Sequence, residues 1–135
     1  MYEARLRNGK ERLHILCENA TSILDAVEAV TIEYSTSNSD EQGGEMEVYS
    51  VFLSKYKEVA RKQNASADED HRWYDTTVYT TFEDENTGKV KKNKYHILVE
   101  ASDFDDATAQ VRKLIEQGYD METFSVQETD FHDVL

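Results

Sequence analysis

Apolar and polar positions alternate near the start of the chain, and this pattern predicts two β-strands, Tyr2–Arg7 and Arg12–Cys17. The Asn8-Gly9 pair stands between them and predicts a tight hairpin turn, because both residue types tolerate positive φ. A third strand is expected at Glu45–Ser54, where apolar residues fall on both faces, which is typical of a strand inside a sheet. Ser54–Gln63 is expected to form a short helix or an irregular tail. Before the third strand, apolar residues recur at the spacing of a helix: Ile23, Ala26, Val27, Val30 and Tyr34.

The second half of the chain repeats this plan. Strands are predicted at Trp73–Phe82, Val90–Glu100 and Tyr119–Glu128, with a longer hairpin turn at Glu83–Lys89. A helix is predicted to begin at Ser102, because a Ser followed three residues later by an acid resembles a capping box. The expected buried stripe and end of this helix are Phe104, Ala107, Val111, Leu114, Ile115 and then Gly118.

The two halves also share sequence. EMEVYSV, which begins at Glu45, returns as DMETFSV at Asp120, and LHILCE at Leu13 returns as YHILVE at Tyr95. The order of the matches indicates a tandem duplication. We therefore predict an α+β fold made of two ββαβ repeats, 1–63 and 72–135, joined by a linker at 64–71 and packed as one compact domain. Two helices are expected on one face of a joined antiparallel or mixed sheet, with pseudo-two-fold symmetry.

The chain is acidic throughout, with a net charge of −13. This charge opposes binding to nucleic-acid backbones and anionic membranes, and it favours solubility or a basic partner. No apolar run is long enough for a membrane span, and the start of the chain lacks a signal-peptide pattern. The single cysteine, Cys17, aligns with Val99, which predicts an apolar core position. These features predict a cytoplasmic protein.

The run Trp73–Thr108 combines an aromatic pair, a Lys-rich hairpin, the strand end Leu98-Val99-Glu100-Ala101, and the Ser102-Asp103-Phe104 helix start. With these features the run resembles a family of small uncharacterised proteins of Bacteroidetes and their phages, and a phage origin would place the protein in the host cytoplasm. The first half departs from this pattern, because it has no Trp and a shorter hairpin. The resemblance implies a fold and a possible phage origin, and it implies no activity.

The residues that could carry chemistry have ordinary structural explanations. His14 and His96 occupy equivalent positions, either as a metal or ligand pair or as half-exposed strand residues kept by the repeat; the linker and C-terminal histidines, His71 and His132, are expected at the surface. No spacing fits a zinc site, a Ser-His-Asp arrangement or a phosphate-binding glycine loop. We therefore expect no enzyme, no metal and no cofactor. Three acids could hold a cation or simply complement a helix dipole: Asp103, Asp105 and Asp106.

The leading hypothesis is a non-enzymatic accessory factor that binds a protein partner, with an unknown oligomeric state. The expected contact residues are exposed aromatics of the second hairpin, Trp73 and Tyr79, and the acidic helix start. A second hypothesis is an acidic mimic of DNA that inhibits a host nucleic-acid-binding protein. A third is binding of single-stranded nucleic acid, although the same lysines could instead protect a strand edge: Lys89, Lys91, Lys92 and Lys94.

Overall fold

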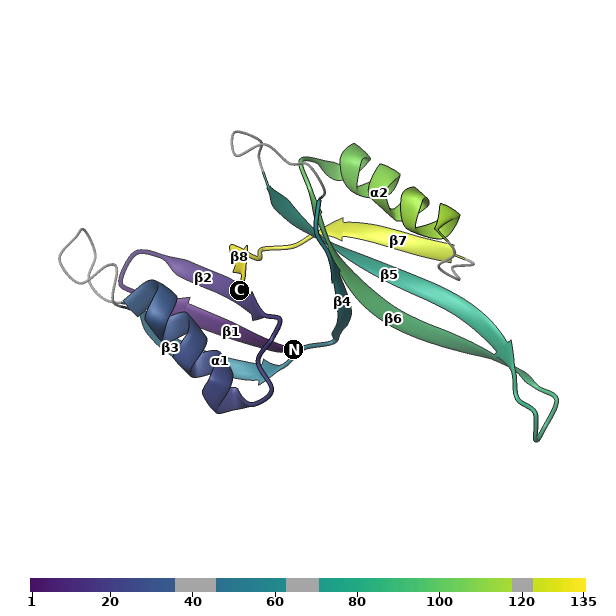
Figure 1. Cartoon of the computed structure of the whole chain (residues 1–135), viewed down its shortest axis with the longest axis horizontal. Coiled ribbons are helices and arrows are strands. Elements are labelled where there is room, and N and C mark those ends of the chain that lie inside the picture. Colours follow the sequence, from purple (N-terminus) through teal and green to yellow (C-terminus); the bar gives the residue numbers. More distant parts are fainter. Residues whose placement is uncertain (36–45, 63–70, 118–122) are drawn as a thin grey trace. The chain divides into compact units, whose positions relative to one another are not determined.

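A computed structural model describes residues 1–35, 46–62, 71–117 and 123–135 (Figure 1). The chain forms two compact units, which are Met1–Ser54 with Asp130–Leu135 (unit 1) and Lys55–Thr129 (unit 2). Each unit has one helix and one four-stranded mixed sheet, so the fold is α+β as predicted. Most of the predicted linker, and Gly118, lie outside the described residues.

Unit 1 contains strands β1 (Tyr2–Arg7), β2 (Arg12–Cys17), β3 (Glu47–Leu53) and β8 (Asp133–Val134), in the order β3-β1-β2-β8. All pairs are antiparallel except β2 with β8, which is parallel. Helix α1 (Ile23–Val30) continues into a π-helical turn at Thr31–Ser35. Its apolar side covers one face of the sheet, and the buried core comprises Ala4, Leu6, Ile15, Cys17, Ala26, Val30 and Met46.

Unit 2 contains strands β4 (Tyr56–Ala60), β5 (Arg72–Glu83), β6 (Val90–Ala101) and β7 (Thr123–Glu128), in the order β4-β6-β5-β7. Here β4 runs parallel to β6, and the other pairs are antiparallel. Helix α2 (Phe104–Glu116) packs on this sheet. The core beneath it comprises Tyr74, Val78, Ile97, Val99, Ala101, Ala107 and Val111.

The two units are built alike from different parts of the sequence. Each half of the sequence supplies two hairpin strands, a helix and a third strand to one unit, in this chain order. It then supplies a short strand to the sheet of the other unit: β4, from the first half, pairs with β6, and β8, from the second half, pairs with β2. Backbone contacts match as well, since the N–H of Ser54 donates to the carbonyl of Met1, and the N–H of Thr129 donates to that of Trp73. This is the arrangement that a duplicated ββαβ segment predicts.

Five expectations about the fold are corrected. Tyr56–Ala60 is a strand and not a helix or tail, because it adds to the edge of β6. The third strand of the first half lies at the edge of its sheet, not inside it, and the two sheets are separate. Ile23 and Phe104 are exposed, since each stands at the first helical position. Helix α2 is capped one residue later than predicted, by Asp103, whose carboxylate accepts the N–H of Asp106 at 2.8 Å.

No helix among the described residues is long and apolar enough to cross a membrane.

Candidate binding site

The lysine-rich hairpin of unit 2 extends beyond the strands that flank it (Figure 1). Strand β7 pairs with β5 only as far as Tyr79, and β4 pairs with β6 only from His96 onward. We call the segment beyond these limits, Thr80–Lys94, the hairpin arm. Within the described residues, both outer edges of the arm lack a neighbouring strand. The outer edge of β6 along Val90–Lys94 could therefore accept an added strand.

Exposed side chains of two kinds gather on the hairpin arm. Phe82 and Val90 keep 51% and 72% of their surface exposed. The Lys91 ammonium lies 2.9 Å from the Asp84 carboxylate and lowers the pKa of that acid. All four lysines of the predicted cluster are exposed: Lys89, Lys91, Lys92 and Lys94.

Trp73 does not offer the exposed ring that was predicted. It is only 5% exposed, because it lies at the start of β5 with the Arg61 guanidinium 5.8 Å from its ring centre. Its carbonyl accepts hydrogen bonds from the N–H and hydroxyl of Thr129. Tyr79 is half-buried at the base of the hairpin arm. The expectation of an exposed aromatic surface is therefore wrong for Trp73.

The acidic start of α2 is occupied by helix capping. Asp103 is the cap, and Asp106 accepts the N–H and hydroxyl of Ser102 at 2.9 and 3.1 Å. The Lys62 ammonium lies 3.1 Å from the same carboxylate, and these contacts lower the pKa of Asp106. Asp105 is exposed in the first turn, where the helix dipole favours it. Capping explains Asp103 and Asp106 without a cation.

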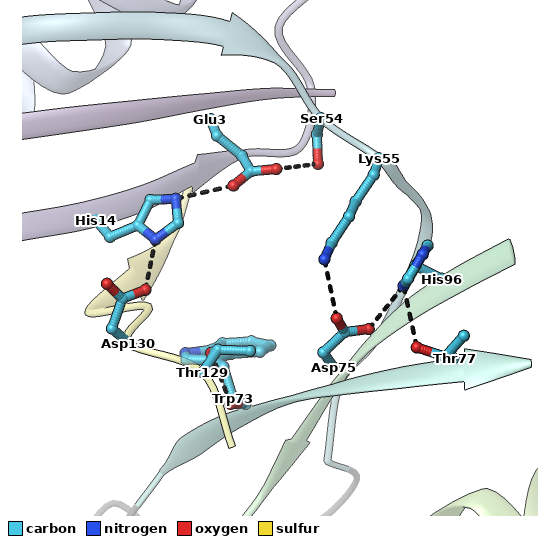
Figure 2. Close-up of polar contacts among 10 residues, drawn as sticks. All are labelled: Glu3, His14, Ser54, Lys55, Trp73, Asp75, Thr77, His96, Thr129 and Asp130. Carbon is cyan, nitrogen blue, oxygen red and sulfur yellow. Dashed lines mark hydrogen bonds and ion pairs between the residues drawn. The ribbon is translucent and has the colours of Figure 1, made fainter. Parts of the chain in front are cut away.

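His14 lies between two carboxylates in unit 1 (Figure 2). Its Nδ1 is 2.7 Å from Oδ1 of Asp130, and its Nε2 is 2.8 Å from Oε1 of Glu3. Because an ionised carboxylate only accepts, the two contacts together fit a ring that carries hydrogen on both nitrogens, which is an imidazolium. Burial alone would lower the pKa of His14, but the hydrogen bonds to Glu3 and Asp130 outweigh it and raise the pKa. Phe131 stacks on the ring, with ring centres 3.9 Å apart.

These contacts hold the C-terminal segment to the sheet of unit 1. The carbonyl of His14 accepts the N–H of His132 at 2.7 Å, and that of Leu16 accepts the N–H of Leu135 at 2.8 Å. The Tyr34 hydroxyl, in the turn after α1, donates to Asp133 at 2.9 Å. Burial and this hydrogen bond raise the pKa of Tyr34.

His96 has a different environment in unit 2. Its Nδ1 is 3.0 Å from Oδ1 of Asp75, whose other oxygen lies 3.1 Å from the Lys55 ammonium (Figure 2). Tyr56 meets the ring edge-on at 6.1 Å between centres. The side chains of His14 and His96 are only 12% and 17% exposed, so neither is the half-exposed residue that the sequence suggested.

The His14 cluster lacks the geometry of a nucleophilic site. The Ser54 hydroxyl donates to Oε2 of Glu3 at 2.9 Å, so its hydrogen is directed at a carboxylate. A general base needs a free ring nitrogen, and both nitrogens of His14 are engaged. Cys17 is buried as predicted, and burial raises the pKa of its thiol, away from the reactive thiolate. Among the described residues, no group of three or more His, Cys, Asp or Glu side chains is placed to hold a metal ion.

A hollow on the helix-free face of the unit 1 sheet was missed by sequence reasoning. It has a volume of about 350 Å³, and its lining residues are Arg5, Arg12, Leu13, His14, Tyr49 and Asp130. Alternation along the first two strands places Arg5, Arg12 and His14 on this face. That signal is present in the sequence, but the contribution of Asp130 depends on where the C-terminal segment returns.

Comparison with known proteins gives a family and no activity. No curated protein and no solved structure matches the chain. The model of a family described as a domain of unknown function, DUF4494, matches residues 7–135. This confirms the resemblance to an uncharacterised family and extends it from the second half to almost the whole chain. The chain belongs to the DUF4494 family.

Proposed function

We propose that this protein is a non-enzymatic binding protein, and that its hairpin arm pairs with an extended segment of a partner protein. The observation that carries the proposal is the edge of β6 along Val90–Lys94, which has no neighbouring strand among the described residues on the side where β4 pairs from His96 onward. A partner strand added there would pair with backbone groups that face no other strand within the described part of the chain.

The charge of the hairpin arm indicates what kind of segment it would accept. Four of the chain's basic residues are concentrated there, in a protein whose net charge is −13. Lysines along a strand edge disfavour pairing with a second copy of the same edge, because like charges would face each other. The same lysines favour an acidic strand. Phe82 and Val90 add exposed apolar surface at the end of the arm.

Affinity capture with matched charge reversals tests this proposal. The arm variant carries Lys92→Glu and Lys94→Glu, and the control carries Lys10→Glu and Lys113→Glu, which change the net charge equally at other exposed positions. We expect the wild type and the control to capture the same protein after nuclease treatment, and the arm variant to lose it. Full capture by the arm variant would show that the hairpin arm is not the contact surface.

Binding of single-stranded nucleic acid is the second candidate, because all four lysines are exposed. Nuclease would then abolish capture, and the wild type would retard oligonucleotides with an affinity that falls steeply with salt. An acidic mimic of DNA predicts the opposite response, since added negative charge in the arm variant would maintain or strengthen binding to a basic partner. The three outcomes are distinct in one set of variants.

A further inference from the structure

The helix-free face of the unit 1 sheet concentrates positive charge in an acidic protein. Strand register sets Arg5 opposite His14 and Arg7 opposite Arg12 on this face. Like charges directly opposite each other on neighbouring strands destabilise a sheet. Such an arrangement calls for compensating negative charge nearby.

Most of these cations have a partner within the unit. Arg7 lies 3.4 Å from the Glu47 carboxylate and 4.7 Å from the centre of the Tyr49 ring. Arg5 lies 5.1 Å from the centre of the Phe52 ring, and His14 binds its two carboxylates. Arg12 is exposed, and in the part of the chain that the structure describes, its side chain has no ion pair or hydrogen bond.

Unit 2 does not share this concentration of arginines. In the aligned repeat, Thr77 and Tyr79 stand where unit 1 has Arg5 and Arg7, and Lys94 stands where it has Arg12. The fold of the repeat therefore does not require the arginines. Because the fold does not need these arginines and their like charges repel each other across the strands, they indicate a role other than folding.

We propose that the hollow lined by Arg5, Arg12, His14 and Tyr49 binds the phosphate group of a small molecule. Arg5 and Arg12 would donate hydrogen bonds to the phosphate oxygens, as guanidinium groups do in charge-assisted pairs. His14 would contribute positive charge without donating, because Glu3 and Asp130 already accept from both of its nitrogens. Several cations around one site favour a dianionic phosphate monoester over a monoanionic carboxylate.

The remaining walls indicate the rest of the ligand. The hollow, at about 350 Å³, is larger than a bare phosphate ion requires. The Tyr49 ring lines it beside the arginines, which suits an apolar or aromatic group next to the phosphate. Asp130 also lines the hollow, and its carboxylate would repel the phosphate and restrict it to the side of the arginines.

Calorimetric titration of the full chain with phenyl phosphate, at constant ionic strength, tests the site. We expect saturable binding that weakens at least tenfold in Arg12→Gln and is unchanged in Lys113→Gln, which removes one exposed positive charge from unit 2. Inorganic phosphate should bind more weakly, and benzoate more weakly still. Since Arg12 faces another arginine, Arg12→Gln should keep or raise the melting temperature, which separates lost binding from lost folding.

Three results would overturn the inference. The first is an absence of saturable binding of phenyl phosphate by the wild type. The second is equal weakening by Arg12→Gln and Lys113→Gln, which would mean general charge attraction. The third is equal affinity for inorganic and phenyl phosphate, which would remove Tyr49 from the site.

Discussion

In each unit, a segment from the other half of the sequence lies beside a histidine on the second hairpin strand, which is His14 in unit 1 and His96 in unit 2. The charged groups around these two histidines differ. An aromatic residue contacts each ring, Phe131 at His14 and Tyr56 at His96. A carboxylate on the first hairpin strand also contacts each ring, from Glu3 and Asp75 respectively. The repeated fold therefore preserves the ring contact and the first carboxylate.

One aligned position separates the two clusters. Asp130 precedes Phe131 in unit 1, and Lys55 precedes Tyr56 in unit 2. Asp130 gives His14 a second carboxylate, whereas Lys55 shares the single carboxylate of Asp75 with His96. Two units with like folds can thus hold a ring in place in the same way while the residue at one position changes the charge around it.

Removing each histidine should reveal the difference most strongly. His14→Ala leaves the Glu3 carboxylate, with a side chain only 7% exposed, without its cationic partner, and we expect a loss of about 3 kcal/mol in the free energy of unfolding. In His96→Ala the Asp75 carboxylate keeps Lys55 at 3.1 Å, so a loss of about 1 kcal/mol is expected. Urea unfolding followed by circular dichroism measures both. Equal losses would show that the second carboxylate of unit 1 adds nothing.

The sequence predicted the parts of the fold that depend on local contacts, and it did not predict those that depend on contacts between distant segments. The hairpins and the second helix followed from alternation, turn residues and apolar spacing, and the 12-residue strands β5 and β6 match the predicted ones within one residue at each end. The equivalence of His14 and His96 also came from the repeat. Tyr56–Ala60 was missed, because a parallel edge strand is specified by the sheet it joins and not by its own alternation.

The surroundings of the two histidines depended on the same missing pairings. Asp130 is 116 positions from His14 along the chain, and only the parallel pairing of β8 with β2 brings it near. Trp73 was expected at the surface as one of the aromatics of the second hairpin. In the structure Arg61 lies over its ring, and the Thr129 hydroxyl donates to its carbonyl. Thr129 is 56 positions away along the chain, so this contact could not be predicted from local sequence.

The pH dependence of stability should show a further effect of the charges around His14, smaller than the loss expected for His14→Ala. The pKa of His14 is raised above its ordinary value of 6.5 in the folded protein. The folded state therefore binds this proton more tightly than the unfolded state does. The resulting contribution of His14 to the free energy of unfolding is complete below pH 6.5 and is lost as the pH rises through the folded pKa. The pKa of Asp130 is lowered from 3.8 by His14, so its contribution is present above pH 3.8 and is lost as pH falls through the folded value.

Together these shifts predict that the His14–Asp130 pair stabilises unit 1 most between about pH 4 and pH 6.5. Melting temperatures measured across that range and up to pH 9 would show the decline for the wild type. His14→Gln should lack the part of the decline above pH 6.5, because its side chain does not titrate. A wild type and His14→Gln with parallel profiles above pH 6.5 would contradict the assignment of an imidazolium.

The smallest expected difference concerns the hydroxyl residues just before each exchanged strand segment. The Ser54 hydroxyl donates to the buried Glu3 carboxylate at 2.9 Å, whereas the Thr129 hydroxyl donates to the neutral carbonyl of Trp73 at 2.7 Å. A hydrogen bond to a charged acceptor contributes more than one to a neutral acceptor, so we expect Ser54→Ala to cost roughly 2 kcal/mol and Thr129→Val roughly 1 kcal/mol. The Trp73 carbonyl also keeps the backbone N–H of Thr129 at 2.9 Å, which limits the second loss. Urea unfolding of the two variants measures the difference, and a larger loss for Thr129→Val would mean that Glu3 relies on His14 alone.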